Sequence, residues 1–203
     1  MDYAIVAVVS YLLGSIPTGL LVGKALGGID IRRYGSGNIG ATNTLRVLGP
    51  KASAIVLIAD FVKGALPVIV VSLLFGDELH KILAALGALT GHNWSIFMGL
   101  KGGRGVATGI GGLVIMSPLL FAVNVGSGLA VIVASRYVSL GSIVGAAVII
   151  FMGILMFAVG NVSSQFFIYV VIGGSMVLFK HRDNLARLLK GKERKLGEHV
   201  QAS

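Results

Sequence analysis

The sequence contains no cysteine, so disulfides, thiolate catalysis and cysteine metal ligands are all excluded. Charged residues are also scarce at 12% of the chain, whereas 55% of the residues are hydrophobic and the mean hydropathy is +0.91. So little charge excludes an ordinary soluble domain and indicates an integral membrane protein. Among the charged residues the acidic ones are the minority, with eight Asp and Glu against seventeen Lys and Arg, which gives a net charge of +9.

Apolar runs long enough to cross a bilayer follow one another along the chain. We predict an all-α integral membrane protein that forms a single domain of residues 1–203 with about seven transmembrane helices. The expected spans are residues 3–24, 52–75, 80–98, 104–116, 119–135, 138–159 and 165–180. The first span should be retained, because it carries Asp2 and lacks the basic start of a cleavable signal.

Proline is rare, with four residues in the chain, and two of them are expected to interrupt helices. Pro17 should kink the first span and free a backbone carbonyl for a polar partner. Pro118 should divide the apolar run of residues 106–135. As one helix this run would extend about 45 Å, well beyond a hydrocarbon core of about 30 Å.

Lysine and arginine concentrate in alternate loops, as is typical of the cytoplasmic side of membrane proteins. They occupy the loops after the first, third and fifth spans and the basic tail from about residue 180. The N-terminus is therefore expected outside and the C-terminus in the cytoplasm. Because the charges fall between apolar segments, we expect membrane lipids and not nucleic acid as partners.

Residues 33–46 interrupt the apolar pattern with glycine, serine, asparagine and threonine between two arginines. The backbone N–H groups of such a loop can converge on a phosphate, which Arg46 would neutralise. The spacing also matches G-x-G-x-x-G, but an apolar helix and not a strand precedes it, so the match to a dinucleotide fold is weak. The candidate substrate-binding residues here are Gly35, Gly37, Asn38, Gly40, Thr42 and Asn43.

Two further polar clusters are expected on the same cytoplasmic face. The first comprises Lys101, Gly102, Gly103, Arg104 and Gly105, in which two cations bracket glycines just before an expected helix, an arrangement suited to phosphate. In the second, His181 and Asn184 share one helical face with an apolar stripe. Together the three clusters predict one site for an anion. Individually, solvated loops, a flexible basic turn or an interfacial helix also explain them.

Three titratable side chains lie inside expected spans. His92, near the inner end of the third span, would serve as a base, orient a substrate or simply pack. Asp60 and Lys63 share a helical face and are expected to form a structural ion pair. Since no second histidine or carboxylate lies at metal-ligand spacing, we predict no metal site and no cofactor.

In this order, the three clusters resemble the bacterial acyl-phosphate-dependent glycerol-3-phosphate 1-O-acyltransferases, small integral membrane enzymes that begin phosphatidic acid synthesis. The first signature comprises residues 15–19 and 35–43 with Arg46, and the second comprises residues 91–94, Phe97 and residues 101–109. The third comprises His181, Arg182, Asn184, Leu185, Arg187, Leu188, Leu189, Gly191 and Glu193. Arg104 stands where that family usually has a lysine, so a cation is kept.

The resemblance implies transfer of a fatty acyl group from acyl phosphate to the C1 hydroxyl of glycerol 3-phosphate, which yields lysophosphatidic acid and phosphate. It also implies a bacterial inner membrane location with the active site facing the cytoplasm. By resemblance Ser36 and Arg46 are needed for catalysis, and His181 and Asn184 contribute to activity. The glycines at 102, 103 and 105 would help to bind glycerol phosphate, and Glu193 would support the structure.

Several alternatives stay open at this point. The proton of the acceptor hydroxyl would pass to His92, to His181 or to the acceptor's own phosphate. A transporter or channel for an organic phosphate is the alternative function, disfavoured because we find no duplicated halves and the polar clusters share one face. A scaffold in a lipid-synthesis complex is a third. A monomer is compatible with the sequence, which does not fix the oligomeric state.

Overall fold

The computed structural model describes residues 1–198 of the chain. Its α-helices are α1 (Asp2–Gly14), α2 (Thr18–Gly27), α3 (Ala41–Leu74), α4 (Glu78–Asn93), α5 (Val106–Met116), α6 (Pro118–Ser135), α7 (Val138–Ala158), α8 (Ser164–Lys180) and α9 (Arg182–Leu189). Two short 3-10 turns, η1 (Ile31–Arg33) and η2 (Ile96–Met98), lie in the connections. Among these residues no strand forms, so the fold is all-helical as predicted.

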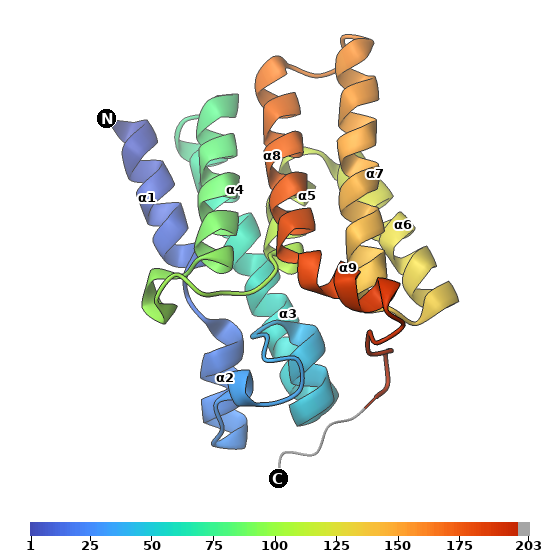
Figure 1. Cartoon of the computed structure of the whole chain (residues 1–203). Coiled ribbons are helices and arrows are strands. Elements are labelled where there is room, and N and C mark those ends of the chain that lie inside the picture. The colour runs from blue at the N-terminus through green and yellow to red at the C-terminus, as the bar shows by residue number, and fades with distance from the viewer. Residues whose placement is uncertain (199–203) are drawn as a thin grey trace.

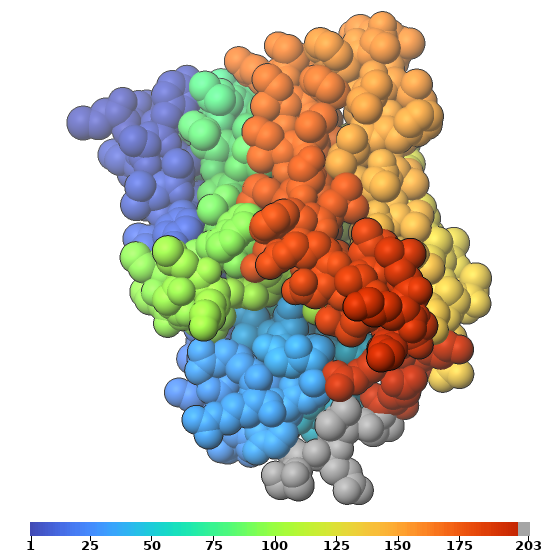
Figure 2. Space-filling model, in the orientation of Figure 1, coloured from blue at the N-terminus to red at the C-terminus, as the bar shows by residue number. Residues whose placement is uncertain are grey.

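The helices form one bundle, in which the loop before α3, the connection between α4 and α5, and α9 lie toward the same end (Figure 1). The helices α1, α4, α8 and α7 stand side by side, with the N-terminus at one end of the bundle, while α2, the start of α3 and α9 lie toward the other (Figure 1). In the space-filling view, the segments around residues 35, 100 and 190 pack closely at this second end (Figure 2). The three predicted polar clusters therefore share one end of the molecule.

Within residues 1–198, four helical stretches are long and apolar enough to cross a membrane. They are Asp2–Gly27, Ala41–Leu74, Pro118–Ser135 and Val138–Ala158. The helices α5 and α8 are apolar but shorter. A multi-pass membrane protein needs such helices, because backbone groups in lipid must find their hydrogen bonds within the segment.

Both predicted proline breaks are confirmed. At the first break α1 ends at Gly14 and α2 begins at Thr18, so Pro17 marks an interruption and not merely a kink. At the second, Pro118 occupies the first turn of α6, where a missing N–H costs nothing, and the Ser117 hydroxyl accepts the Leu120 N–H at 3.3 Å. The helices after this break agree with the expected spans to within one residue.

The expected loop at residues 33–46 is wrong in its second half, because α3 begins at Ala41. Residues 41–48 form a short helical piece that ends at Gly49, whose φ of +82° separates it from the long apolar part of α3. Asn43 explains the difference, since its buried side-chain amide donates to the carbonyls of Ile31, Tyr34 and Asn38. These contacts fold the preceding loop onto the helix, and local composition does not reveal them.

The third expected span is also too long, because α4 ends at Asn93 and not near residue 98. The next residues form a small hairpin in which the Ser95 N–H donates to the Lys101 carbonyl at 3.2 Å. Ile96 and Phe97 extended the apparent apolar run, yet they are 55% and 61% exposed. Hydropathy cannot separate an apolar turn at the bilayer surface from one more helical turn.

Small residues bring the helices into close contact. A Cβ atom at Gly14 would lie 2.1 Å from the Ala88 carbonyl oxygen, which places α1 directly against α4. Likewise, a Cβ at Gly64 would lie 2.0 Å from the Thr108 carbonyl oxygen, so α3 and α5 touch backbone to backbone. Such contacts replace the hydrophobic driving force that is missing between helices in lipid, and they hold the helices that carry the site.

Candidate active site

A cavity of about 370 Å³ lies among the three polar clusters. The first cluster contributes Ser36, Asn38, Gly40, Thr42, Asn43 and Arg46 to its wall. The second contributes Arg104 and Gly105, and the tail contributes His181 and Glu193. Asp60 and His92 also line the cavity. The fold therefore joins residues from all three clusters in one cavity, as the sequence predicted.

Other candidate residues lie outside this wall. Lys101 is exposed, and Gly102 and Gly103 lie behind the cavity against the end of α4. Gly35 and Gly37 take positive φ values of 60° and 72° and shape the loop without lining the cavity. Lys63 and Asn184 do not line the cavity themselves, but they contact Asp60 and Glu193, which do.

The loop before α3 does not offer its N–H groups to a ligand as we expected. The Ser36 N–H donates to the Asn43 side-chain oxygen at 2.7 Å, and the Gly40 N–H donates to the Asn38 side-chain oxygen at 2.8 Å. The Gly37 N–H is likewise used by the Tyr34 carbonyl. Free N–H groups lie instead at the start of α3, which has no side-chain cap. This helix N-terminus, with its positive dipole end, faces the cavity at Ala41 and Thr42.

Two arginines face the cavity without a carboxylate partner. Within residues 1–198 the arginine ion pairs involve Arg32, Arg182 and Arg187, so Arg46 and Arg104 are both unpaired. Arg46 is only 9% exposed, and its Nε is a buried donor without an acceptor. A buried cation without a counter-ion is costly, so this pair of guanidinium groups favours an anionic ligand.

The end of the chain crosses the rim of the cavity and contacts Arg46. The Arg46 Nη2 donates to the Arg194 carbonyl oxygen at 3.2 Å. Leu196 lines the cavity and exchanges hydrogen bonds with Arg136, its N–H donating to the Arg136 carbonyl at 2.7 Å. This segment was not predicted as part of the site, because nothing in its basic composition distinguishes it from a solvated tail.

Glu193 fixes the end of α9 to the start of α7. Its carboxylate accepts hydrogen bonds from Asn184 at 2.6 Å, Ser139 at 2.8 Å and Arg187 at 2.7 Å. Burial alone would raise the pKa of Glu193, but these donors outweigh it and hold the pKa below its usual value. An ionised Glu193 at neutral pH agrees with the structural role that the resemblance implied. The Ser139 contact was not predicted, because Ser139 and Glu193 are 54 residues apart in the sequence.

His181 is buried at the turn between α8 and α9, and its ring is neutral at physiological pH. Its Nδ1 lies 2.8 Å from the Val177 carbonyl oxygen, which can only accept, so Nδ1 carries the proton and Nε2 is left as an acceptor. Burial, reinforced by the charge of Arg104, lowers the pKa of His181 to about 4. A group this weakly basic suits an orienting hydrogen bond better than proton removal.

A pH profile tests this assignment of His181. Because its lowered pKa places protonation near pH 4, we expect His181 to stay neutral from pH 5.5 to 8. His181→Asn should therefore lower kcat/KM by about ten-fold at every pH, the worth of one hydrogen bond, without changing the shape of the profile. A phosphate ester substrate, with a second pKa near 6, would titrate equally in both proteins. If the wild-type profile has a step between pH 6 and 7 that is missing from the variant profile, the step belongs to His181 and contradicts the assignment.

The glycines before α5 are required by packing. A Cβ at Gly102 would lie 2.2 Å from the His92 carbonyl oxygen, and one at Gly105 would lie 2.6 Å from the Asn93 side-chain oxygen. The Gly103 N–H donates to the His92 carbonyl at 3.0 Å. The side-chain amide of Asn93 is fully buried and has no hydrogen-bond partner within residues 1–198. These glycines let the loop lie flat on the end of α4, which brings Arg104 to the cavity.

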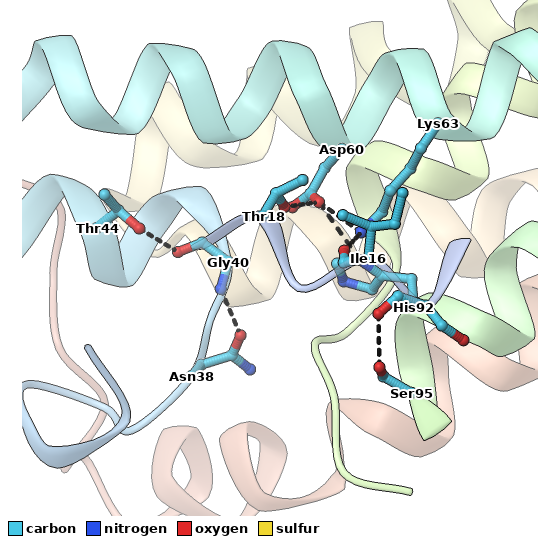
Figure 3. Close-up of polar contacts among 10 residues, drawn as sticks. Ile16, Thr18, Asn38, Gly40, Thr44, Asp60, Lys63, His92 and Ser95 are labelled. Atoms are coloured by element: carbon cyan, nitrogen blue, oxygen red, sulfur yellow. Dashed lines mark hydrogen bonds and ion pairs between the residues drawn. The ribbon is translucent and has the colours of Figure 1, made fainter. Parts of the chain in front are cut away.

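The buried acid in the cavity wall has more partners than the predicted ion pair. Lys63 lies 2.8 Å from Asp60, as expected, but Thr18 also donates to the same carboxylate. His92 approaches it with Nδ1 at 3.5 Å (Figure 3). Thr18 was not foreseen, because it is distant in the sequence. Among residues 1–198, no three histidine or acidic side chains gather in a way that could hold a metal ion.

Comparison with known proteins identifies the family to which the chain belongs. The family model described as glycerol-3-phosphate acyltransferase matches residues 4–191, nearly the whole chain. The chain belongs to the glycerol-3-phosphate acyltransferase family. It is 48% identical to glycerol-3-phosphate acyltransferase 2 of Moorella thermoacetica, over 94% of this chain and 96% of that protein. It is 41% identical to the glycerol-3-phosphate acyltransferase of Thermoanaerobacter sp. strain X514, over 98% of both.

Solved structures of this acyltransferase family share the fold. The glycerol 3-phosphate form of PlsY (YgiH), an integral membrane glycerol 3-phosphate acyltransferase, superimposes with a TM-score of 0.88 at 35% identity, covering 97% of this chain and 96% of that one. Its lysophosphatidic acid form gives a TM-score of 0.85 at 34% identity, over 98% and 97%. The family resemblance stated from the sequence is thus confirmed, and the chain is a multi-pass membrane protein.

Proposed function

We propose that this chain transfers a fatty acyl group from acyl phosphate to the C1 hydroxyl of glycerol 3-phosphate, giving lysophosphatidic acid and phosphate. Its relatives are glycerol-3-phosphate acyltransferases, which supports acyl transfer to this acceptor. The observation that carries the proposal is that Arg46 and Arg104, both without a carboxylate partner within residues 1–198, face one cavity beside the uncapped start of α3. Two phosphate-bearing substrates match this concentration of positive charge.

In the reaction the acceptor hydroxyl oxygen attacks the carbonyl carbon of the mixed anhydride, and the bond to the phosphate oxygen breaks. The leaving group is already a stable anion, so it needs little protonation. Charge develops on the carbonyl oxygen and passes to the departing phosphate, where Arg46 and Arg104 stabilise it. Holding both substrates in one cavity replaces a collision in solution by a reaction between positioned groups.

The hydroxyl proton needs an acceptor. His181 is neutral at physiological pH but very weakly basic, so its Nε2 orients the hydroxyl and does not remove the proton. The dianionic phosphate of the acceptor, with a pKa near 6, is a stronger base. Ser36 lies in the wall beside Arg46, where its hydroxyl would donate to a phosphate oxygen.

We further propose seven membrane crossings, an outside N-terminus and a cavity that opens to the cytoplasm of a bacterial cell at its inner membrane. The cavity lies at the end of the bundle that carries α9 and most of the basic residues, which is the cytoplasmic side under the positive-inside rule. Glycerol 3-phosphate would enter from the water, whereas the acyl chain would stay in the lipid between helices. We propose that the chain acts without a cofactor.

The test is product formation by the purified protein in detergent, where no compartments exist. With acyl phosphate and radiolabelled glycerol 3-phosphate, we expect labelled lysophosphatidic acid and an equal amount of inorganic phosphate. Acyl-CoA in place of acyl phosphate should give at least 100-fold less product. No product in detergent, together with uptake of a phosphate ester by vesicles that contain the protein, would instead identify a transporter.

A further inference from the structure

One buried carboxylate in the cavity wall contacts side chains from three helices (Figure 3). Asp60 of α3 is 2% exposed and accepts a hydrogen bond from the Thr18 hydroxyl at the start of α2. Its Oδ1 lies 2.8 Å from the Lys63 Nζ and 3.5 Å from the Nδ1 of His92 on α4. A single oxygen atom therefore meets polar groups from α2, α3 and α4, and the His92 Nδ1 is a buried nitrogen with no hydrogen-bond partner among the described residues.

The partner cation is held at the break in the first span. The Lys63 Nζ donates to the Ile16 carbonyl oxygen at 3.0 Å, just before Pro17 interrupts the helix (Figure 3). This carbonyl lies in the break between α1 and α2, where its other hydrogen bond among the described residues comes from the Thr18 N–H at 3.0 Å. Lys63 thus has a structural task of its own, which the ion pair with Asp60 supports.

The imidazole of His92 links this carboxylate to the glycine loop. One edge of the ring presents Nδ1 to Asp60, while the other edge lies against Gly103, where a Cβ would come within 2.1 Å of Nε2. The backbone carbonyl of His92 accepts the Gly103 N–H at 3.0 Å. The ring of His92 therefore lies between Asp60 and the loop that carries Arg104.

We propose that Asp60 is a positioning residue of the acyltransferase, which acts through His92 to fix residues 102–105 for binding glycerol 3-phosphate. The inference rests on the proposed function. The carboxylate lies 3.5 Å from the otherwise unpartnered His92 Nδ1, so its charge favours a proton on that nitrogen and one orientation of the ring, which in turn sets where Gly103 lies. A plain ion pair would need only Lys63, yet Asp60 also engages His92 and lines the cavity.

A matched pair of variants separates this role from that of the ion pair. Asp60→Leu/Lys63→Met and Asp60→Asn/Lys63→Met both remove the buried charges, and replacing such a pair by neutral groups of similar size is generally tolerated. Leucine and asparagine share a side chain branched at Cγ, with leucine the larger, but only the asparagine retains an oxygen that can accept from His92. Comparison between them therefore isolates the hydrogen-bond acceptor.

We expect the KM for glycerol 3-phosphate to be about ten-fold higher in the leucine variant than in the asparagine variant, the cost of leaving the His92 ring without a polar acceptor beside it. The KM for acyl phosphate and the kcat should differ by less than about three-fold between the two. In a His92→Gln background the ten-fold difference should shrink below about two-fold, because residues that act through one another are not additive. A purely structural role would change thermal stability in detergent without this selectivity.

Equal KM values for glycerol 3-phosphate in two folded variants would overturn the inference, as would a ten-fold difference that persists in the His92→Gln background. Should the leucine variant fail to fold, His92→Phe removes the same polar contact from the other side. It must then raise the KM for glycerol 3-phosphate by a similar factor, and an unchanged KM overturns the inference. The wild-type protein in the same assay tests the proposed function separately. If the proposed function is wrong, no sample makes product, whereas failure of this inference alone leaves the wild type active.

Discussion

Replacing Arg46 by alanine is expected to lower kcat/KM for acyl transfer by about 10³-fold, because removal of one charge-stabilising donor from a dry site costs two to three orders of magnitude. The guanidinium faces the cavity from the first helical piece of α3 and has no carboxylate partner among the described residues. Its only side-chain hydrogen bond there goes to the Arg194 carbonyl, which a substrate phosphate can replace. Initial rates with both substrates varied would give the measurement.

Arg46→Lys is the matched control for this change. Lysine keeps the positive charge but loses the planar fork that grips two oxygens of a phosphate, so a loss of about 10- to 100-fold is expected. Both proteins should remain monodisperse in detergent, since Arg46 makes one hydrogen bond and no ion pair within residues 1–198. An alanine variant that retains more than a tenth of the wild-type kcat/KM would show that Arg46 does not stabilise the transition state.

Replacing Gly102 by alanine is expected to raise the KM for glycerol 3-phosphate by at least 100-fold. The added Cβ would lie 2.2 Å from the His92 carbonyl oxygen and 2.7 Å from that of Asn93, and backbone atoms cannot move aside as a flexible side chain can. The loop must therefore shift away from α4 and carry Arg104 out of position. A displacement of about 1 Å in a positioned group is enough for a loss of this size.

The control is Gly126→Ala in α6, where nothing lies within 4 Å of the added atom. We expect this variant to retain wild-type kinetic constants and to be slightly more stable, because alanine favours a helix interior by about 1 kcal/mol over glycine. Gly102→Ala should unfold within a few degrees of the wild type, since the strain is confined to a loop. A normal KM in a folded Gly102→Ala protein would contradict the packing argument.

Much of the fold follows from local features of the sequence. Apolar runs, Pro17 and Pro118 give the later helices and both breaks, because each of these depends on a few adjacent residues. A helix in lipid must satisfy its own backbone, so hydropathy and proline positions are sufficient to place it. The same reasoning failed at Asn93, where α4 ends although the apolar residues continue. Exposed apolar residues in a turn carry the same signal as a helix.

In the candidate site, too, some features follow from single segments and others from helix packing. The sequence by itself predicted that the three polar clusters share one end of the bundle and form one anion site, because charge and polarity are properties of each segment. In the structure Arg46 and Arg104 line one cavity there. Only the tertiary structure decided which atoms meet. The Arg46 contact joins residues 148 apart, and the Lys63 contact joins residues 47 apart. Such contacts depend on how the helices pack, which no single segment encodes.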